Sequence, residues 1–147
     1  MHSLAIAAVA FAGGVVFAAA AAPTPPLLGS TTVPWAQIEG AAPSGAKGMS
    51  RPVLKSATAT LDELEMHVTK LAPGQAPHPP HQHAEEEVVI VKEGTLEVMQ
   101  SGKVSRAPAG SVIFQASNQL HGVKNVGDTT ASYYVIRWAS PGTKKKP

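Results

Sequence analysis

The sequence predicts an all-β fold, a two-sheet sandwich or a small barrel, and two observations lead to this prediction. Beyond Lys55, short apolar stretches are separated by turn-forming residues at near-regular intervals, and no window sustains helical periodicity. Stretches such as 88–91 and 133–138 are apolar on both faces, which indicates strands that are covered on both sides. Two packed sheets or a closed barrel supply that cover.

The predicted strands follow one another along this part of the chain. They cover residues 64–71, 87–92, 95–100, 104–106, 111–115, 121–125 and 131–138. Glycine-containing pairs mark the turns at 73–74, 93–94, 101–102, 109–110 and 127–128. The sequence has no internal repeat and no Gly-rich phosphate loop ahead of a helix.

The chain of 147 residues and 15.1 kDa suits one domain with short extensions. We expect a signal peptide over 1–22, an extended Pro- and Gly-rich arm over 23–55, the β-barrel domain over 56–140 and a basic tail over 141–147. Trp35 and Ile38 are isolated apolar residues in the arm. The sequence leaves open whether the arm is a loose linker or whether Trp35 fixes it to the surface of the domain or to a second subunit.

The N-terminal stretch from Leu4 to Ala22 has no charged residue and ends in Ala20-Ala21-Ala22, an Ala-x-Ala pattern followed by a Pro-rich segment. This pattern is typical of a cleaved export signal, so we expect a periplasmic or extracellular protein with no stable membrane partner after cleavage. The alternative is an uncleaved N-terminal membrane anchor, since no Lys or Arg precedes the apolar stretch.

Composition excludes several classes of chemistry. The sequence has no cysteine, which removes disulfides, thiolate metal sites and cysteine nucleophiles. Three of the twelve basic residues are the tail lysines 144–146, which leaves nine against ten acidic residues in the rest of the chain. We therefore predict no nucleic-acid partner, because that function requires basic residues gathered on one face.

Residues with metal-binding chemistry gather between His78 and Gly94. Side chains two apart on a strand share a face, so His81 and His83 would point the same way, and Glu87 keeps that parity. Two imidazoles and a carboxylate would then converge.

Nearby residues offer alternatives. Glu85 and Glu86 are the other carboxylates, but Glu87 begins the apolar strand, whereas Glu85 would crowd a metal held by His83. His78 is expected to be a solvated loop residue, and His67 is expected to face outward because Leu64, Met66 and Val68 form the opposite face of its strand.

With these residues in place, the chain resembles the cupin family in two motifs. The series His81-x-His83-x3-Glu87-x6-Gly94 fits the first motif, and Gly74 lies one residue further upstream than the motif has it. The second motif falls on Gly110-x5-Ala116-x-Asn118-x2-His121-x3-Asn125, with Ala116 in place of proline and Asn118 in place of glycine. Asn118 should still permit the turn, because asparagine tolerates a left-handed backbone.

The resemblance covers about 61–138 and implies a double-stranded β-helix, the cupin or jelly-roll barrel. It also implies one mononuclear metal held by His81, His83, Glu87 and His121. Three imidazoles and one carboxylate suit a divalent transition metal, without distinguishing Fe, Mn, Zn, Ni, Cu and Co. Such a ligand set leaves coordination positions open for a small molecule.

We therefore expect an exported, homodimeric cupin that acts on a small organic molecule as an oxygenase, isomerase or hydrolase. The dimer is expected because strands apolar on both faces exceed what one small core covers. Cupins also serve as non-catalytic binding or sensing modules, and this is the alternative function. A metal-stabilised structural domain is the third interpretation.

Overall fold

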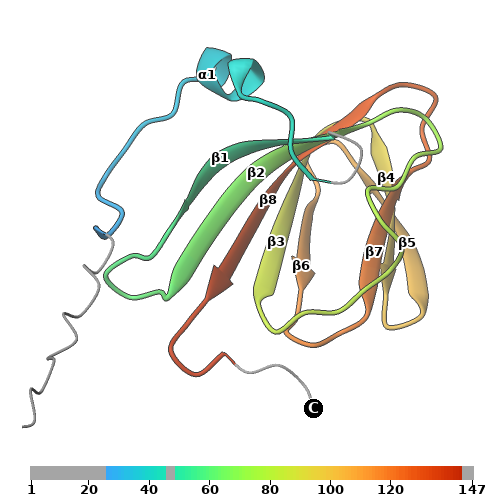
Figure 1. Cartoon of the computed structure of the whole chain (residues 1–147). Helices are drawn as coiled ribbons and strands as arrows, with labels where there is room; N and C mark the ends of the chain where they lie inside the picture. The colour runs from blue at the N-terminus through green and yellow to red at the C-terminus, as the bar shows by residue number, and fades with distance from the viewer. Residues whose placement is uncertain (1–25, 46–48, 144–147) are drawn as a thin grey trace, which may run out of the picture.

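The computed structural model describes residues 26–45 and 49–143. They contain one short helix and eight strands, named here in chain order: α1 (Trp35–Gly40), β1 (Ser50–Ser56), β2 (Glu63–Leu71), β3 (Glu86–Glu93), β4 (Thr95–Gln100), β5 (Lys103–Pro108), β6 (Val112–Gln115), β7 (His121–Asn125) and β8 (Ala131–Ala139). The strands form two antiparallel sheets, one in the order β1-β2-β8-β3-β6 and one in the order β5-β4-β7. Figure 1 shows these sheets as the two sides of a small barrel. The predicted all-β fold is confirmed.

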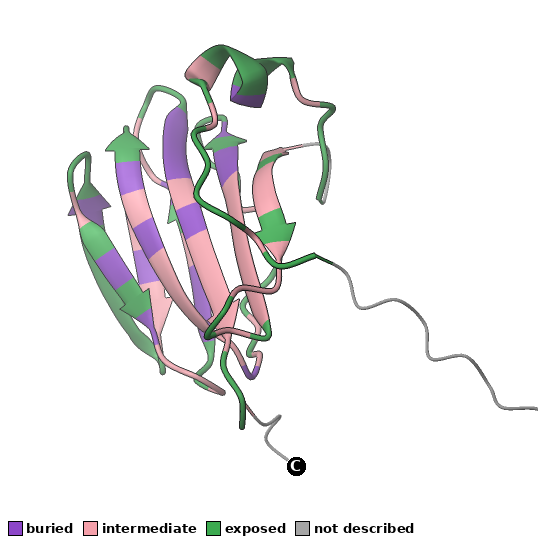
Figure 2. Cartoon of the chain, turned by 90° about the vertical axis from the view of Figure 1, so that its left-hand side faces the viewer, coloured by how far each residue is buried: buried purple, intermediate pink, exposed green. Residues whose placement is uncertain are grey.

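The core lies between the two sheets. Buried residues recur at alternate positions of the strands, as Figure 2 shows, because successive side chains of a strand point to opposite faces. The cluster of buried apolar side chains that forms it comprises Leu71, Val89, Val91, Leu96, Val98, Ala107, Ile113, Ala131, Tyr133 and Val135. These side chains come from both sheets and fix the distance between the two walls of the barrel.

Asn125, the last residue of the second motif, connects three segments of the chain. Its side chain is fully buried, at 0% exposure. The Nδ2 group donates hydrogen bonds to the carbonyl oxygens of Leu71 and Thr129, at 2.9 and 2.8 Å, and Oδ1 accepts one from the Gly127 amide at 2.9 Å. Asn125 therefore stabilises the barrel rather than contributing to a site.

Gly94 forms the tight connection from β3 to β4. Its φ of +77° lies in the left-handed region that side chains disfavour. A Cβ at this position would lie 2.7 Å from the Cα of Ala131. Both observations explain why the first motif ends in glycine here.

The expected arm over 23–55 contains two elements that the sequence did not predict, helix α1 and strand β1. Strand β1 pairs antiparallel with β2 at the edge of the large sheet, and its register shifts between Pro52 and Leu54. An edge position tolerates a proline, because the missing N–H faces away from the ladder. The strands of the barrel thus begin at Ser50 rather than after Lys55.

Trp35 of α1 packs onto the outer face of the same chain. Its ring lies edge-on to Tyr134, with 6.4 Å between the centroids, and the Lys92 ammonium lies 3.8 Å from the ring centroid. Lys70 binds Glu39 of the same helix at 3.0 Å. Trp35 thus contacts the surface of its own domain, where the helix covers part of the outer apolar face.

The predicted signal peptide over 1–22 lies outside the described residues, as do the tail lysines. Within 26–45 and 49–143, no helix is long and apolar enough to cross a membrane.

Candidate metal centre

Three histidines come together from two distant parts of the chain. His81 and His83 lie in the loop between β2 and β3, and His121 is the first residue of β7. The loop is tied to β7 by an isolated antiparallel bridge. In this bridge the His81 amide donates to the His121 carbonyl and the His121 amide to the His81 carbonyl, both at 2.9 Å. Backbone pairing therefore places the side chains of His81 and His121 beside each other.

The turn before β7 holds the other end of the histidine loop. The Asn118 amide donates to the His83 carbonyl at 2.7 Å, and the Ser117 hydroxyl donates to the Ala84 carbonyl at 2.6 Å. Asn118 adopts a φ of +57°. The expectation that asparagine would preserve this turn in place of glycine is confirmed.

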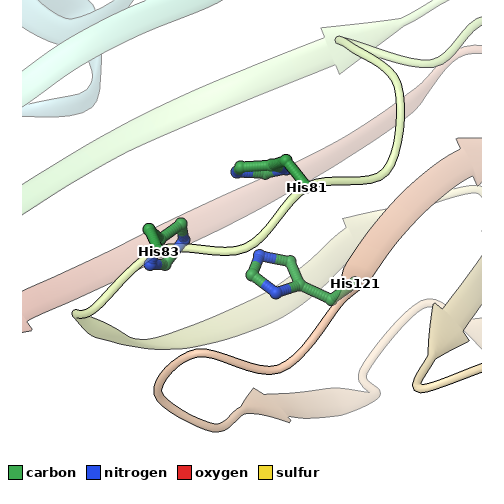
Figure 3. Close-up of side chains that lie close together, drawn as sticks. All are labelled: His81, His83 and His121. Carbon is green, nitrogen blue, oxygen red and sulfur yellow. The ribbon is translucent and has the colours of Figure 1, made fainter. Parts of the chain in front are cut away.

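The three imidazole rings converge, as Figure 3 shows. Ring centroids lie 4.8 Å apart for His81 and His121, 4.9 Å for His83 and His121, and 5.3 Å for His81 and His83. One nitrogen from each ring lies within 4.8 Å of the others, a spacing at which the three atoms could hold one metal ion. The predicted convergence of these histidines is confirmed.

Hydrogen bonding orients two of the rings. His83 Nδ1 donates to the Glu85 carbonyl at 2.9 Å and His121 Nδ1 to the Gln119 carbonyl at 2.8 Å. A carbonyl only accepts, so Nδ1 carries the proton and Nε2 keeps its lone pair in the neutral ring. Such bonds fix the tautomer and orientation of metal-binding histidines.

Each ring also carries one buried nitrogen without a hydrogen-bond partner: His81 Nδ1, His83 Nε2 and His121 Nε2. Buried polar atoms are normally paired, because leaving one unpaired costs about 1–3 kcal/mol. Three such atoms in one cluster fit a metal ion as their common partner.

Glu87 lies beside this cluster. Its Oε2 is 3.7 Å from His83 Nε2, and 15% of its side chain is exposed. Glu85 lies at the opposite edge of the same ring, with Oε2 3.5 Å from Nδ1. Glu86 lines a separate surface hollow with Trp138. Among the three consecutive carboxylates, Glu87 thus stands on the side of the unpartnered nitrogens.

Charge and burial shift the pKa values of these groups in different directions. Burial lowers the pKa of His81 to about 4, with the neighbouring histidines adding to the effect. The Glu87 carboxylate raises the pKa of His83. Burial alone would raise the pKa of Glu87, but His83 and His121 outweigh it and lower that pKa. Near neutral pH the site therefore holds a carboxylate and a neutral His81.

The histidines and Glu87 line a cavity of about 200 Å³ between the sheets. His67 lines it as well, so the prediction that His67 faces outward is wrong. The outer face of β2 is apolar because α1 and the arm cover it, and His67 points inward. His78 also lines the cavity, and its ring lies 4.1 Å from that of His81 between centroids.

Arg137 is a further cavity residue that the sequence analysis missed. It lies two residues beyond Val135 and four beyond Tyr133, both of which are buried and face the same cavity. Alternate residues of a strand share a face, so the positions of Tyr133 and Val135 could have placed Arg137 in the cavity. The other residues of 133–138 are apolar on both faces of the strand, so the sequence does not show which face lines the cavity.

Fold and site define a class: a small antiparallel β-barrel with a candidate metal centre inside it. Residues 67–137 match the family described as cupin domain. The chain therefore contains a cupin domain, as the two motifs implied. No curated protein sequence matches the chain.

Solved structures of cupin proteins share the fold. A cupin 2 conserved barrel domain protein from Salinispora arenicola is 25% identical, with a TM-score of 0.52, and the match covers 60% of this chain and 73% of that one. A predicted oxalate decarboxylase from Thermotoga maritima is 21% identical, with a TM-score of 0.53 and coverage of 69% and 96%. The Cnp3 cupin domain of Schizosaccharomyces pombe is 14% identical, with a TM-score of 0.54 and coverage of 63% and 66%.

Proposed function

We propose that this cupin domain holds one divalent transition metal on His81, His83, His121 and Glu87 and uses it to act on a small organic molecule. The observation that carries the proposal is a cluster of three histidines that each offer one nitrogen within 4.8 Å of the others, and that each have a buried nitrogen without a hydrogen-bond partner. Glu87 is the carboxylate on their side of His83, and its charge would offset half that of a divalent ion.

Such a metal would polarise a bound oxygen atom as a Lewis acid. The chain's own residues hold the ligands: the Glu85 and Gln119 carbonyls orient His83 and His121, and the cavity walls restrict the size of the molecule that enters. Oxygenation, isomerisation and hydrolysis are the reaction classes proposed for this site.

Paired carboxamide variants test the ligand set. Glu87→Gln keeps the size of the side chain but removes its charge, and it should lower the affinity for Mn(II) by at least about tenfold. Glu85→Gln is the matched control and should bind Mn(II) within about twofold of wild type, because Glu85 lies at the far edge of His83. Equal losses in both variants would contradict the assignment of Glu87.

Turnover assays separate an enzyme from a binding protein. Metal-loaded protein would be incubated with phenolic, keto-acid and ureido compounds, and the products followed by mass spectrometry. Metal-dependent product supports the enzyme. Persistent stoichiometric binding without product would support the alternative, a binding or sensing cupin.

We also propose that the protein is exported after cleavage near Ala21 to Pro23. The support is the uncharged N-terminal stretch that ends in Ala20-Ala21-Ala22. N-terminal sequencing of the protein from its native compartment tests this. Met1 retained in a membrane fraction would instead support an anchor.

A homodimer is the proposed assembly. Strand β6 lies at the edge of the large sheet, and Val112 and Phe114 on it are 68% and 51% exposed. Exposed apolar side chains on an edge strand favour pairing with another chain. Light scattering at micromolar concentration should give twice the mass of one chain, and a monomer mass would refute the proposal.

A further inference from the structure

A row of three charged side chains crosses the large sheet at the level of the candidate metal centre. Arg137 of β8 lies directly opposite Glu65 of β2 on one side and Glu87 of β3 on the other. Residues directly opposite on antiparallel strands share a face of the sheet, with Cβ atoms about 5 Å apart. Arg137 is therefore a direct neighbour of the proposed carboxylate ligand, and both line the same cavity.

Arg137 is held in place by Glu65. Its Nη2 group forms an ion pair with Oε2 of Glu65, and Oε1 of Glu65 lies 3.2 Å from His67 Nδ1. The side chain of Arg137 is 29% exposed and that of Glu65 is 19% exposed. A guanidinium carries five N–H donors in a planar fork, more than one carboxylate accepts. Arg137 is thus oriented by one carboxylate and has the chemistry to bind a second.

The charge of the cavity favours an anion. A divalent metal with Glu87 carries one net positive charge, and the pair of Arg137 and Glu65 adds none. The histidine ligands are neutral when they bind a metal. One positive charge therefore remains, in a cavity only partly open to water, and a monoanion would neutralise it.

Valine side chains form part of the remaining wall, which Ser50, Thr69 and Tyr133 also line. Val89 and Val135 are 1% and 5% exposed, and both line the cavity together with Val123. Val89 pairs with Val135 across the two strands. This pair lies two residues along the strands from the pair of Glu87 and Arg137. A bound molecule would meet charged groups at one end and valine side chains at the other.

We propose that the molecule bound by this domain is a small monocarboxylate, whose carboxylate pairs with Arg137 beside the metal while its carbon chain lies against Val89, Val123 and Val135. The proposal rests on the proposed metal site and names the class of molecule that the site takes. Glu65 acts as a positioning residue for Arg137.

The test compares an acid with its uncharged analogue. Wild-type protein loaded with Mn(II) would be titrated with 2-hydroxybutanoate and with 2-hydroxybutanamide, and binding followed by calorimetry and by the relaxation of water protons on Mn(II). The acid should bind at least about tenfold more tightly than the amide. Equal affinities would overturn the proposal.

Variants identify the residue responsible. Arg137→Met should weaken binding of the acid at least about tenfold and that of the amide less than about twofold. Arg106→Met removes an exposed arginine of β5 and should change neither. The Mn(II) affinity of Arg137→Met is measured first, to show that the variant still binds the metal. If this variant then binds the acid as tightly as wild type, the role of Arg137 is refuted.

A second pair of variants tests whether Arg137 binds the acid if Arg137→Met does not fold. Arg137→Lys keeps the charge but loses the planar fork, so it should bind the acid less tightly than wild type. Glu65→Gln keeps an oxygen that can accept a hydrogen bond from Arg137 and so hold it in place, but it removes the competing negative charge. This variant should therefore bind the acid more tightly than wild type. Weaker binding by Glu65→Gln would contradict the proposal, whereas failure of the wild type to bind Mn(II) would refute the metal site itself.

Discussion

Replacement of His121 by alanine should separate the contribution of the metal to stability from that of the fold. His121 comes from β7, whereas His81, His83 and Glu87 come from one segment before and within β3. A metal held by all four residues joins the two sheets, because β7 and β3 belong to different ones. Removing His121 leaves ligands from one segment only.

The expected magnitude follows from mass action. Free metal at a hundred times its dissociation constant stabilises the folded state by about 2.7 kcal/mol. For a domain of this size, 1 kcal/mol shifts the melting temperature by roughly 4 °C, so wild type should gain about 10 °C on metal addition. His121→Ala should gain less than about 3 °C, because loss of one ligand weakens the metal affinity by orders of magnitude.

The assay is thermal unfolding followed by circular dichroism, with and without Zn(II). The quantity compared is the shift caused by metal, since His121 is 3% exposed and its loss also lowers the melting temperature of the metal-free protein. His78→Ala is the control, because His78 lines the same cavity without an unpartnered buried nitrogen among the described residues. Equal losses of the shift in both variants would refute the assignment of the ligands.

Three further predictions concern the acid limit of metal binding, the core and the arm. Metal affinity should fall as the pH drops through the range in which His83 takes up a proton, because Glu87 raises the pKa of His83, whereas His81 stays neutral down to about pH 4. Calorimetry between pH 5 and 8 measures this, and an affinity independent of pH would contradict it. Asn125→Ala should cost about 3 kcal/mol in urea unfolding, about 1 kcal/mol for each of its buried hydrogen bonds, and a cost below about 1 kcal/mol would be inconsistent with its role. Trp35→Ala should speed proteolysis between residues 27 and 45 while leaving metal affinity unchanged, because Trp35 packs on the outer face; unchanged cleavage would show that Trp35 does not hold the arm.

The barrel was predictable because its strands are short, apolar and bounded by turn residues. β1 escaped prediction because it carries few apolar residues and a proline, and it becomes a strand only through its pairing with β2. His67 was misplaced for a related reason. The sequence shows that one face of β2 is apolar, but the structure shows that α1 and the arm cover that face, so the more polar face is the one that lines the cavity.

The candidate site was predictable in its residues and less so in its geometry. On an extended strand, a period of two places His81, His83 and Glu87 on one face. In the structure β3 begins only at Glu86, and the histidines converge because backbone hydrogen bonds tie their loop to His121 and Asn118. Pairing between segments so far apart in the chain is a tertiary property, which a local period of two does not specify.

This backbone pairing has a consequence for metal binding. The rings of His83 and His121 are oriented by carbonyl groups, and backbone hydrogen bonds bridge the loop that carries His81 to β7. Domains that fold only on binding metal must order their ligands at the expense of binding free energy. Here that ordering comes from Asn118, the bridge and the barrel core, so binding should be tight while the metal-free barrel stays folded.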